Sequence, residues 1–157
     1  MTTSRETDEL FLRQALERAH EGIGLTSPNP CVGAVLVDAN GVVVGTGSYT
    51  YDSVKHAEIQ AIEQAGEKAR GATLYLNLEP CSHQGRTGPC ADAVIAAGVR
   101  RVVACMQDPN PLVSGKGFAR LRDSGVPVRE IAARLGVSVG TVAACSKRLP
   151  RSAFVVP

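Results

Sequence analysis

One histidine and two cysteines, carried by two separate segments, constrain the fold of this chain more than any other feature. The first segment contains His56 and, two residues later, Glu58, and the second contains Cys81 and, after a gap of eight residues, Cys90. An imidazole nitrogen and two thiolates suit zinc, and three protein ligands leave one tetrahedral position open. Any fold of this chain must therefore bring the two segments to one point, close to the carboxyl of Glu58.

Hydrophobic periodicity and turn residues predict where these side chains lie. Apolar residues at helical spacing predict helices over residues 8–21, 56–70, 90–97 and 118–124. Apolar runs bounded by turn residues predict strands over residues 31–38, 42–47, 72–78 and 101–106. The Asn40-Gly41 pair predicts a hairpin between the first two strands. His56 thus begins one helix, Cys81 follows a strand, and Cys90 begins another helix.

The order of these elements predicts the fold class. The later strands alternate with single helices, which indicates parallel strands joined by right-handed crossovers. Together with the antiparallel hairpin, this order predicts an α/β fold, a three-layer α/β/α sandwich with a mixed central sheet. Helix N-termini favour thiolates, and open α/β sheets bind ligands beyond the carboxyl ends of their strands. The predicted fold therefore has a natural place for the metal site.

Length and composition bound the kind of protein. The chain has 157 residues, of which 44% are hydrophobic and 20% charged, as expected for one globular domain. A net charge of +2 gives no reason to expect nucleic acid or an anionic membrane as a partner. No apolar stretch is long enough for a membrane span and the N-terminus lacks a signal-peptide core, so we expect a cytoplasmic protein. Five widely spaced cysteines suit free thiols and metal ligands better than disulfides.

The donor set allows two interpretations. A structural zinc site would need a fourth protein ligand, for which Cys31 or His83 is available, whereas a catalytic site has three and leaves a position for water. The catalytic interpretation is favoured, because His-x-Glu followed by Pro-Cys and a second cysteine resembles the signature of zinc deaminases. Zinc lowers the pKa of water toward neutrality, and Glu58 would take the water proton and return it to the ring nitrogen and leaving amine. The predicted reaction is hydrolytic removal of an exocyclic amine from a heterocycle.

Four segments carry a more specific pattern. They are SPNPCVGA at 27–34, HAE at 56–58, LEPCSHQGRTGPC at 78–90 and MQDPNPLVSGKG at 106–117. On these segments the chain resembles the pyrimidine deaminase domain of riboflavin biosynthesis, within the cytidine-deaminase-like superfamily, over about residues 8–126. The eight-residue gap between the cysteines is the sharpest discriminator, because nucleoside and transfer-RNA deaminases generally have a two-residue gap.

The resemblance implies a substrate and the residues that serve it. The substrate would be 2,5-diamino-6-(5-phosphoribosylamino)pyrimidin-4-one, deaminated at ring carbon 2 to the 5-aminouracil product with release of ammonia. Zn²⁺ would be held by His56, Cys81 and Cys90, with Glu58 as the catalytic residue. The implied substrate contacts are Asn29, His83, Arg86, Asp108 and Asn110. A phosphorylated substrate suits a nearby arginine. The resemblance also implies a homo-oligomer, most commonly a dimer.

The chain departs from the family pattern at three points. Tyr49 stands where family members usually carry a histidine, and residues 51–55 lack a usual glycine. This departure leaves open a deaminase of another amino-heterocycle, such as a guanine-type or cytosine-type base. Gly88 stands where proline is common. The family is usually fused to a reductase domain, which residues 1–157 do not include, so we expect deamination alone and a separate reductase for the product.

Residues 127–157 form a predicted tail beyond a deaminase domain at 1–126. Within the tail, residues 128–142 resemble two helices of a helix-turn-helix DNA-binding unit, with Gly136 in the turn. One interpretation is an amphipathic tail packed on the same domain or on a partner subunit, and the other is a DNA-binding regulator. The first is favoured, because a helix-turn-helix unit usually needs a further helix for its core.

Overall fold

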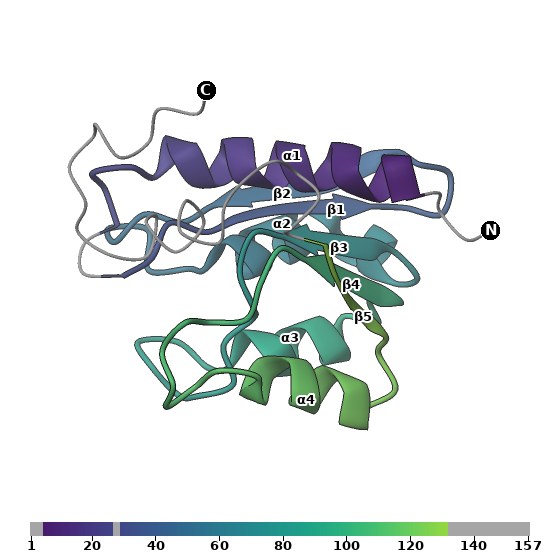
Figure 1. Ribbon diagram of the computed structural model, residues 1–157. Coiled ribbons are helices and arrows are strands. Elements are labelled where there is room, and N and C mark those ends of the chain that lie inside the picture. Colours follow the sequence, from purple (N-terminus) through teal and green to yellow (C-terminus); the bar gives the residue numbers. More distant parts are fainter. Residues whose placement is uncertain (1–4, 27–28, 132–157) are drawn as a thin grey trace.

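The computed structural model describes residues 5–26 and 29–131, shown in Figure 1. Along the chain, the elements are α1 (Arg5–Glu21), β1 (Gly33–Val37), β2 (Val43–Ser48), α2 (Ala57–Ala65), a short 3-10 helix η1 (Gly66–Ala69), β3 (Thr73–Leu76), α3 (Cys90–Ala96), β4 (Arg101–Ala104), α4 (Lys116–Asp123) and β5 (Val128–Glu130). The four helices and four strands predicted over residues 8–124 are present, with bounds that differ by a few residues. None of the helices described is long and apolar enough to cross a bilayer.

The strands form one mixed sheet in the order β2-β1-β3-β4-β5. Strand β1 is antiparallel to both β2 and β3, whereas β3, β4 and β5 are parallel. The hairpin turn is stabilised by Asp38, whose carboxylate accepts hydrogen bonds from the backbone N–H groups of Asn40 and Val42. Gly41 adopts a φ of 81°, a left-handed conformation that glycine adopts without steric cost. The predicted hairpin and mixed sheet are therefore confirmed.

Alternating side chains on the strands give the sheet two buried faces. On one face, Tyr75 and Val103 pack against α1. On the other, Leu74 and Val102 belong to the cluster that α2, α3 and α4 complete. Figure 1 shows α1 on one side of the sheet and the other three helices on the opposite side. This arrangement confirms the predicted three-layer sandwich.

Helix α1 begins at Arg5, three residues before the predicted start, and this changes the role of Asp8. Asp8 is the first residue of the predicted helix, but it lies inside the observed helix and is fully buried. Its carboxylate accepts hydrogen bonds from the Tyr75 hydroxyl at 2.9 Å, from Arg101 at 2.6 Å and from Arg129 at 3.1 Å. These partners lie far along the chain, so no local sequence pattern indicates them. They join α1 to β3, β4 and β5.

Strand β5 lies in the predicted tail. It pairs with β4 in parallel, and the next N–H, of Ile131, donates to the carbonyl of Ala104 at 3.1 Å. Val128–Glu130 begin the segment that resembles a helix-turn-helix unit, but they form a strand and not the start of a helix. A strand of three residues is too short to show a period, and its partner strand determines its conformation. The rest of that segment lies outside the described residues.

Candidate metal and active site

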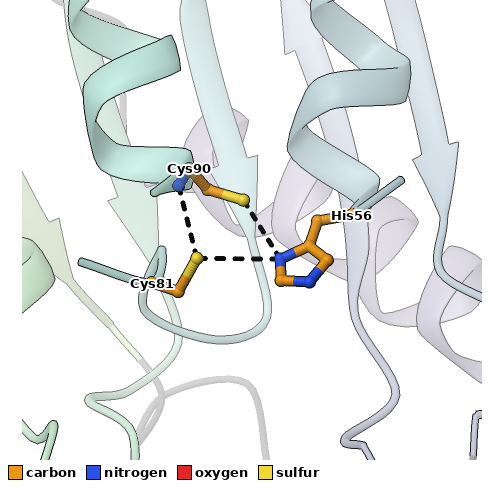
Figure 2. Close-up of side chains that lie close together, drawn as sticks. All are labelled: His56, Cys81 and Cys90. Carbon is orange, nitrogen blue, oxygen red and sulfur yellow. Dashed lines mark hydrogen bonds between the residues drawn. The ribbon is translucent and has the colours of Figure 1, made fainter. Parts of the chain in front are cut away.

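The side chains of His56, Cys81 and Cys90 converge at the N-terminal ends of α2 and α3, as Figure 2 shows. The Nδ1 atom of His56 lies 3.1 Å from the sulfur of Cys90 and 3.7 Å from that of Cys81. All three ligand atoms lie within 4.8 Å of one another. The predicted convergence of the two segments is therefore present in the fold. Such a cluster of one nitrogen and two sulfurs is able to hold a metal ion.

The local backbone explains how each ligand is oriented. His56 is the N-cap of α2, with φ −64° and ψ 158°, and not part of the first helical turn as predicted. In this extended conformation the backbone of His56 lies outside the helix, and its ring lies at the N-terminal end of α2. Cys90 is the first residue of α3, and its N–H donates to the sulfur of Cys81 at 3.3 Å. The N–H of Ala91 donates to the carbonyl of Cys81 at 3.0 Å, so Cys81 is fixed against the start of α3.

Two glycines on β2 bring α2 close to the sheet. A Cβ added to Gly47 would lie 2.0 Å from the carbonyl oxygen of Ala57, and one added to Gly45 would lie 2.1 Å from that of Ala61. Helix α2 therefore rests on the bare backbone of β2. Because Ala57 follows His56 directly, this close approach also sets the position of the metal-ligating ring.

The three candidate ligands influence one another's protonation. Contact with Cys90, together with the neighbouring His56, lowers the pKa of the Cys81 thiol to about 4. The same contact between the sulfurs, together with burial, raises the pKa of the Cys90 thiol. Contact with Cys81 raises the pKa of the His56 imidazole. At neutral pH, Cys81 is thus available as a thiolate, the form that binds metals.

Glu58 is a buried carboxyl beside this cluster. Its exposed fraction is 3%, and its Oε2 has no hydrogen-bond partner within the described part of the chain. Burial raises the pKa of the Glu58 carboxyl to about 7. A buried polar atom without a partner is costly and marks a place where function uses it. A carboxyl with a pKa near neutrality is suited both to accept and to donate a proton.

A cavity of about 600 Å³ opens over these groups. Its lining includes all five predicted substrate contacts, Asn29, His83, Arg86, Asp108 and Asn110. The lining also includes His56, Glu58 and Cys81, while Cys90 is fully buried. The structure therefore brings to one cavity predicted site residues that are as much as 81 positions apart in the chain.

Arg86, the predicted phosphate ligand, is held at the surface by Tyr51. Its guanidinium lies 4.0 Å from the centroid of the Tyr51 ring, and one of its N–H groups donates to the Tyr51 carbonyl at 2.8 Å. An arginine over an aromatic face gains a cation–π interaction. The guanidinium has five N–H donors, so others are available to a ligand. His83, on the same loop, is exposed.

Asp108 and Asn110 organise the loop that carries them. The carboxylate of Asp108 accepts the N–H of Asn110 at 2.9 Å, and the amide oxygen of Asn110 accepts the N–H of Leu112 at 3.1 Å. An Asp-Pro-Asn-Pro sequence is typical of a turn, and these hydrogen bonds hold the loop in that form. Both residues also line the cavity, so the turn presents them to it.

Glu79 is a supporting residue that the sequence analysis did not identify. It is buried, and its carboxylate accepts backbone N–H groups from Asp108 at 3.2 Å, Gly115 at 2.9 Å and Phe118 at 3.1 Å. These hydrogen bonds tie the loop that contains Asn110 to the end of β3 and to the start of α4. The signal available was an acidic residue directly before the Pro-Cys motif, where a buried carboxylate needs several donors.

Tyr49, the main departure from the family pattern, lies at the cavity wall next to Asn29. The side-chain Nδ2 of Asn29 donates to the Tyr49 hydroxyl at 2.7 Å. The Tyr49 ring stands edge-on to the His56 ring, with 5.3 Å between centroids. The sequence indicated that position 49 was unusual, but it did not indicate this contact.

Known proteins are similar to this chain in both sequence and fold. Residues 5–106 match the family described as "Cytidine and deoxycytidylate deaminase zinc-binding region". The "Riboflavin biosynthesis protein RibD" of Aquifex aeolicus is 52% identical over 124 residues, which are 79% of this chain and 35% of that protein. The "Diaminohydroxyphosphoribosylamino-pyrimidine deaminase" of Buchnera aphidicola is 46% identical over 122 residues, 78% of this chain and 82% of that protein.

A solved structure agrees with these relatives. RibD of Acinetobacter baumannii superposes with a TM-score of 0.79 at 43% identity, covering 92% of this chain and 41% of that one. The chain spans about a third of the length of the RibD relatives that it matches in sequence; its match to the Escherichia coli protein covers 33% of that protein. With a family match over most of its described residues and a His-Cys-Cys cluster in the expected place, the chain belongs to the cytidine and deoxycytidylate deaminase family.

Proposed function

We propose that this protein is a zinc-dependent deaminase of riboflavin biosynthesis, a hydrolase acting on the C–N bond of a cyclic amidine. Its substrate is 2,5-diamino-6-(5-phosphoribosylamino)pyrimidin-4-one, and its products are the 5-aminouracil compound and ammonia. The observation that carries this proposal is the His-Cys-Cys cluster at one cavity, beside the buried carboxyl of Glu58, whose Oε2 has no hydrogen-bond partner among the described residues. The names of the Aquifex aeolicus and Buchnera aphidicola relatives support the pathway and the reaction.

The donor set fits zinc with three protein ligands. One imidazole nitrogen and two sulfurs within 4.8 Å of one another match the ligand types that zinc prefers. Among the described residues, neither Cys31 nor His83 belongs to this cluster. The thiol of Cys31 instead lies 3.5 Å from the hydroxyl of Thr26. The three-ligand, catalytic interpretation therefore has more support than a four-ligand structural site.

The protein side chains divide the chemistry among them. Bound zinc supplies Lewis acidity, which lowers the pKa of water toward neutrality. Glu58 accepts a proton from water and delivers protons to the ring nitrogen and the departing amine. Its burial excludes competing solvent and raises the pKa of its carboxyl to about 7, so both transfers are feasible near neutral pH. Ammonia leaves and a ring carbonyl remains.

The cavity also accounts for the proposed substrate class. Asn29 lines the cavity beside Tyr49, whose ring contacts His56, and it is available to the pyrimidine ring. Arg86 and His83 lie on an exposed loop at the cavity and suit a phosphate. Asp108 and Asn110 provide polar oxygens and N–H groups for the ribosyl part of the substrate. With these residue roles, the reacting ring would lie at the metal cluster and the phosphate near solvent.

We also infer the enzyme's partners and its place in the cell. A reductase would take the product, and the enzyme would work in the cytoplasm, where phosphorylated metabolites are retained. A homodimer is the proposed assembly. The deaminase unit extends at least to Ile131, because β5 is part of the central sheet.

An ammonia-release assay tests the function. Purified protein, with its zinc content measured in parallel, is offered the diaminopyrimidine phosphate, its dephosphorylated form, cytosine and guanine. We expect ammonia from the phosphorylated substrate and at least about tenfold lower kcat/KM without the phosphate, because one charge-assisted contact is lost. Release from none of these compounds by zinc-loaded protein would refute the proposal.

A deaminase of another amino-heterocycle is the second candidate. Tyr49 favours it, because this residue replaces the usual histidine at the wall of the cavity beside Asn29. Higher kcat/KM for cytosine or guanine than for the diaminopyrimidine phosphate would establish this alternative.

A further inference from the structure

Tyr49 has a contact for which the proposed mechanism gives no role. The residue is buried, with an exposed fraction of 3%, and it lines the cavity. Its hydroxyl receives a hydrogen bond of 2.7 Å from the side-chain amide of Asn29. A buried hydroxyl at this distance is a strong constraint on the orientation of the amide.

The tyrosine itself is held firmly. Its backbone N–H donates to the carbonyl of Val32 at 3.0 Å, which fixes the start of the side chain. Its ring contacts the His56 ring edge-on, at an interplanar angle of 76°. It also belongs to the hydrophobic cluster beneath α2. The hydroxyl therefore occupies a defined place at the cavity wall.

In this contact, Asn29 uses the nitrogen end of its carboxamide. A carboxamide offers two N–H donors on one end and an acceptor oxygen on the other. The nitrogen end of Asn29 faces Tyr49, and in the described residues no protein donor reaches its Oδ1. Asn29 lines the cavity, so its oxygen is left as an acceptor for a ligand there.

We infer that Tyr49 is a positioning residue that sets substrate specificity by orienting Asn29. The oxygen of Asn29 then accepts an N–H or amino group on the edge of the substrate ring. A heterocycle that offers only acceptors on that edge is disfavoured, because two acceptors would face each other. This inference rests on the proposed deaminase function, since it assumes that the ring binds beside Asn29.

The competing explanation is that Tyr49 serves only as packing for His56. The two explanations differ in what the hydroxyl contributes. Tyr49→Phe removes the hydroxyl and keeps the ring against His56. A packing role predicts little change for this variant, whereas a positioning role predicts weaker substrate binding with the metal retained.

A double-mutant cycle tests the inference. Wild-type protein, Tyr49→Phe, Asn29→Ala and the double variant are compared for zinc content, kcat and KM with the diaminopyrimidine phosphate. We expect Tyr49→Phe to raise KM about tenfold, to change kcat less and to keep wild-type zinc content, since one hydrogen bond that orients a ligand contact is lost. In the Asn29→Ala background, the same change should raise KM by less than about twofold, because residues that act as a unit are not additive.

Tyr75→Phe is the matched control. It also removes a buried, hydrogen-bonded hydroxyl, but this hydroxyl contacts Asp8 on the opposite face of the sheet. We expect it to lower the melting temperature while leaving KM unchanged.

Two outcomes would overturn the positioning role alone: additive effects of the two substitutions on KM, or loss of zinc from Tyr49→Phe with no specific rise in KM. If wild-type protein with full zinc content released no ammonia from the substrate, the proposed function would fail, and the inference with it.

Discussion

Glu58 combines three properties that are rarely found together in a side chain without a function. It is buried, its Oε2 has no hydrogen-bond partner in the described residues, and the pKa of its carboxyl is raised to about 7 by that burial. Each property costs stability, because burial penalises an unpaired charge or polar atom. Its neighbours in space, His56 and Cys81, belong to the metal cluster. The simplest explanation of this cost is that the carboxyl moves protons during the reaction.

Replacement of Glu58 by glutamine should separate proton transfer from metal binding. Glu58→Gln keeps the shape of the side chain but cannot accept a proton, so we expect kcat to fall by about 10² to 10⁴. Zinc content should remain at the wild-type level, because Glu58 is not in the ligand cluster. Ammonia release and metal analysis on the same samples provide the measurement.

The control lies on the same helix. Glu63 is exposed and its carboxylate pairs with Lys55 at 2.7 Å, so Glu63→Gln should change neither kcat nor zinc content. Full activity of Glu58→Gln with bound zinc would show that another group transfers the proton.

The sequence predicts some residues of the site well and others poorly, for a physical reason. His56, Glu58, Cys81 and Cys90 stand in short motifs whose chemistry is evident from residue type and spacing. Contacts between distant segments leave no such local signal. The Asn29 amide meets the Tyr49 hydroxyl across 20 positions, and Glu79 accepts N–H groups that lie 29, 36 and 39 positions further on.

At the scale of elements, the metal site depends on how closely α2 lies on β2. The sequence predicts both elements, because apolar periodicity and the Asn40-Gly41 turn are local signals. It does not predict that the glycines of β2 lie under the helix, since this requires knowing which strand α2 covers. For a similar reason, the sequence did not predict β5. Its three residues acquire strand structure by pairing with β4.

Gly47→Ala should test the link between this packing and the site. The added Cβ would lie 2.0 Å from the carbonyl oxygen of Ala57, a backbone atom of α2 that cannot rotate away. The helix must shift, and we expect a loss of about 1–3 kcal/mol in the free energy of unfolding. Because Ala57 follows His56, zinc affinity should fall as well. Urea unfolding and zinc titration measure the two effects.

A second glycine provides the comparison for stability. At Gly88, an added Cβ would meet Gln84 Oε1 at 3.9 Å, which is ordinary contact. Gly88→Ala should therefore leave the free energy of unfolding nearly unchanged. Equal stability of the Gly47 and Gly88 variants would mean that α2 does not need the bare backbone of β2.

At the scale of the whole molecule, the two faces of the sheet have different tasks. The cavity and the metal cluster lie among the loops and helix ends on the side of α2 and α3, whereas α1 covers the opposite face (Figure 1). Asp8 joins α1 to three strands through Tyr75, Arg101 and Arg129. None of these four residues lines the cavity. Stability and chemistry should therefore respond to different substitutions.

Asp8→Asn should reveal this division. The substitution removes the negative charge that faces Arg101 at 2.6 Å and Arg129 at 3.1 Å, and leaves two guanidinium groups facing a neutral amide. Because Asp8 is fully buried and the arginines are partly exposed, we expect a loss of about 2–4 kcal/mol in the free energy of unfolding. The kcat and KM of the folded protein, measured well below its melting temperature, should stay at wild-type values.

The control is Glu21→Gln, which removes an exposed partner of Arg18 and should lower the free energy of unfolding by less than about 1 kcal/mol. A change of KM in Asp8→Asn larger than in Glu21→Gln would show instead that the α1 face is coupled to the cavity.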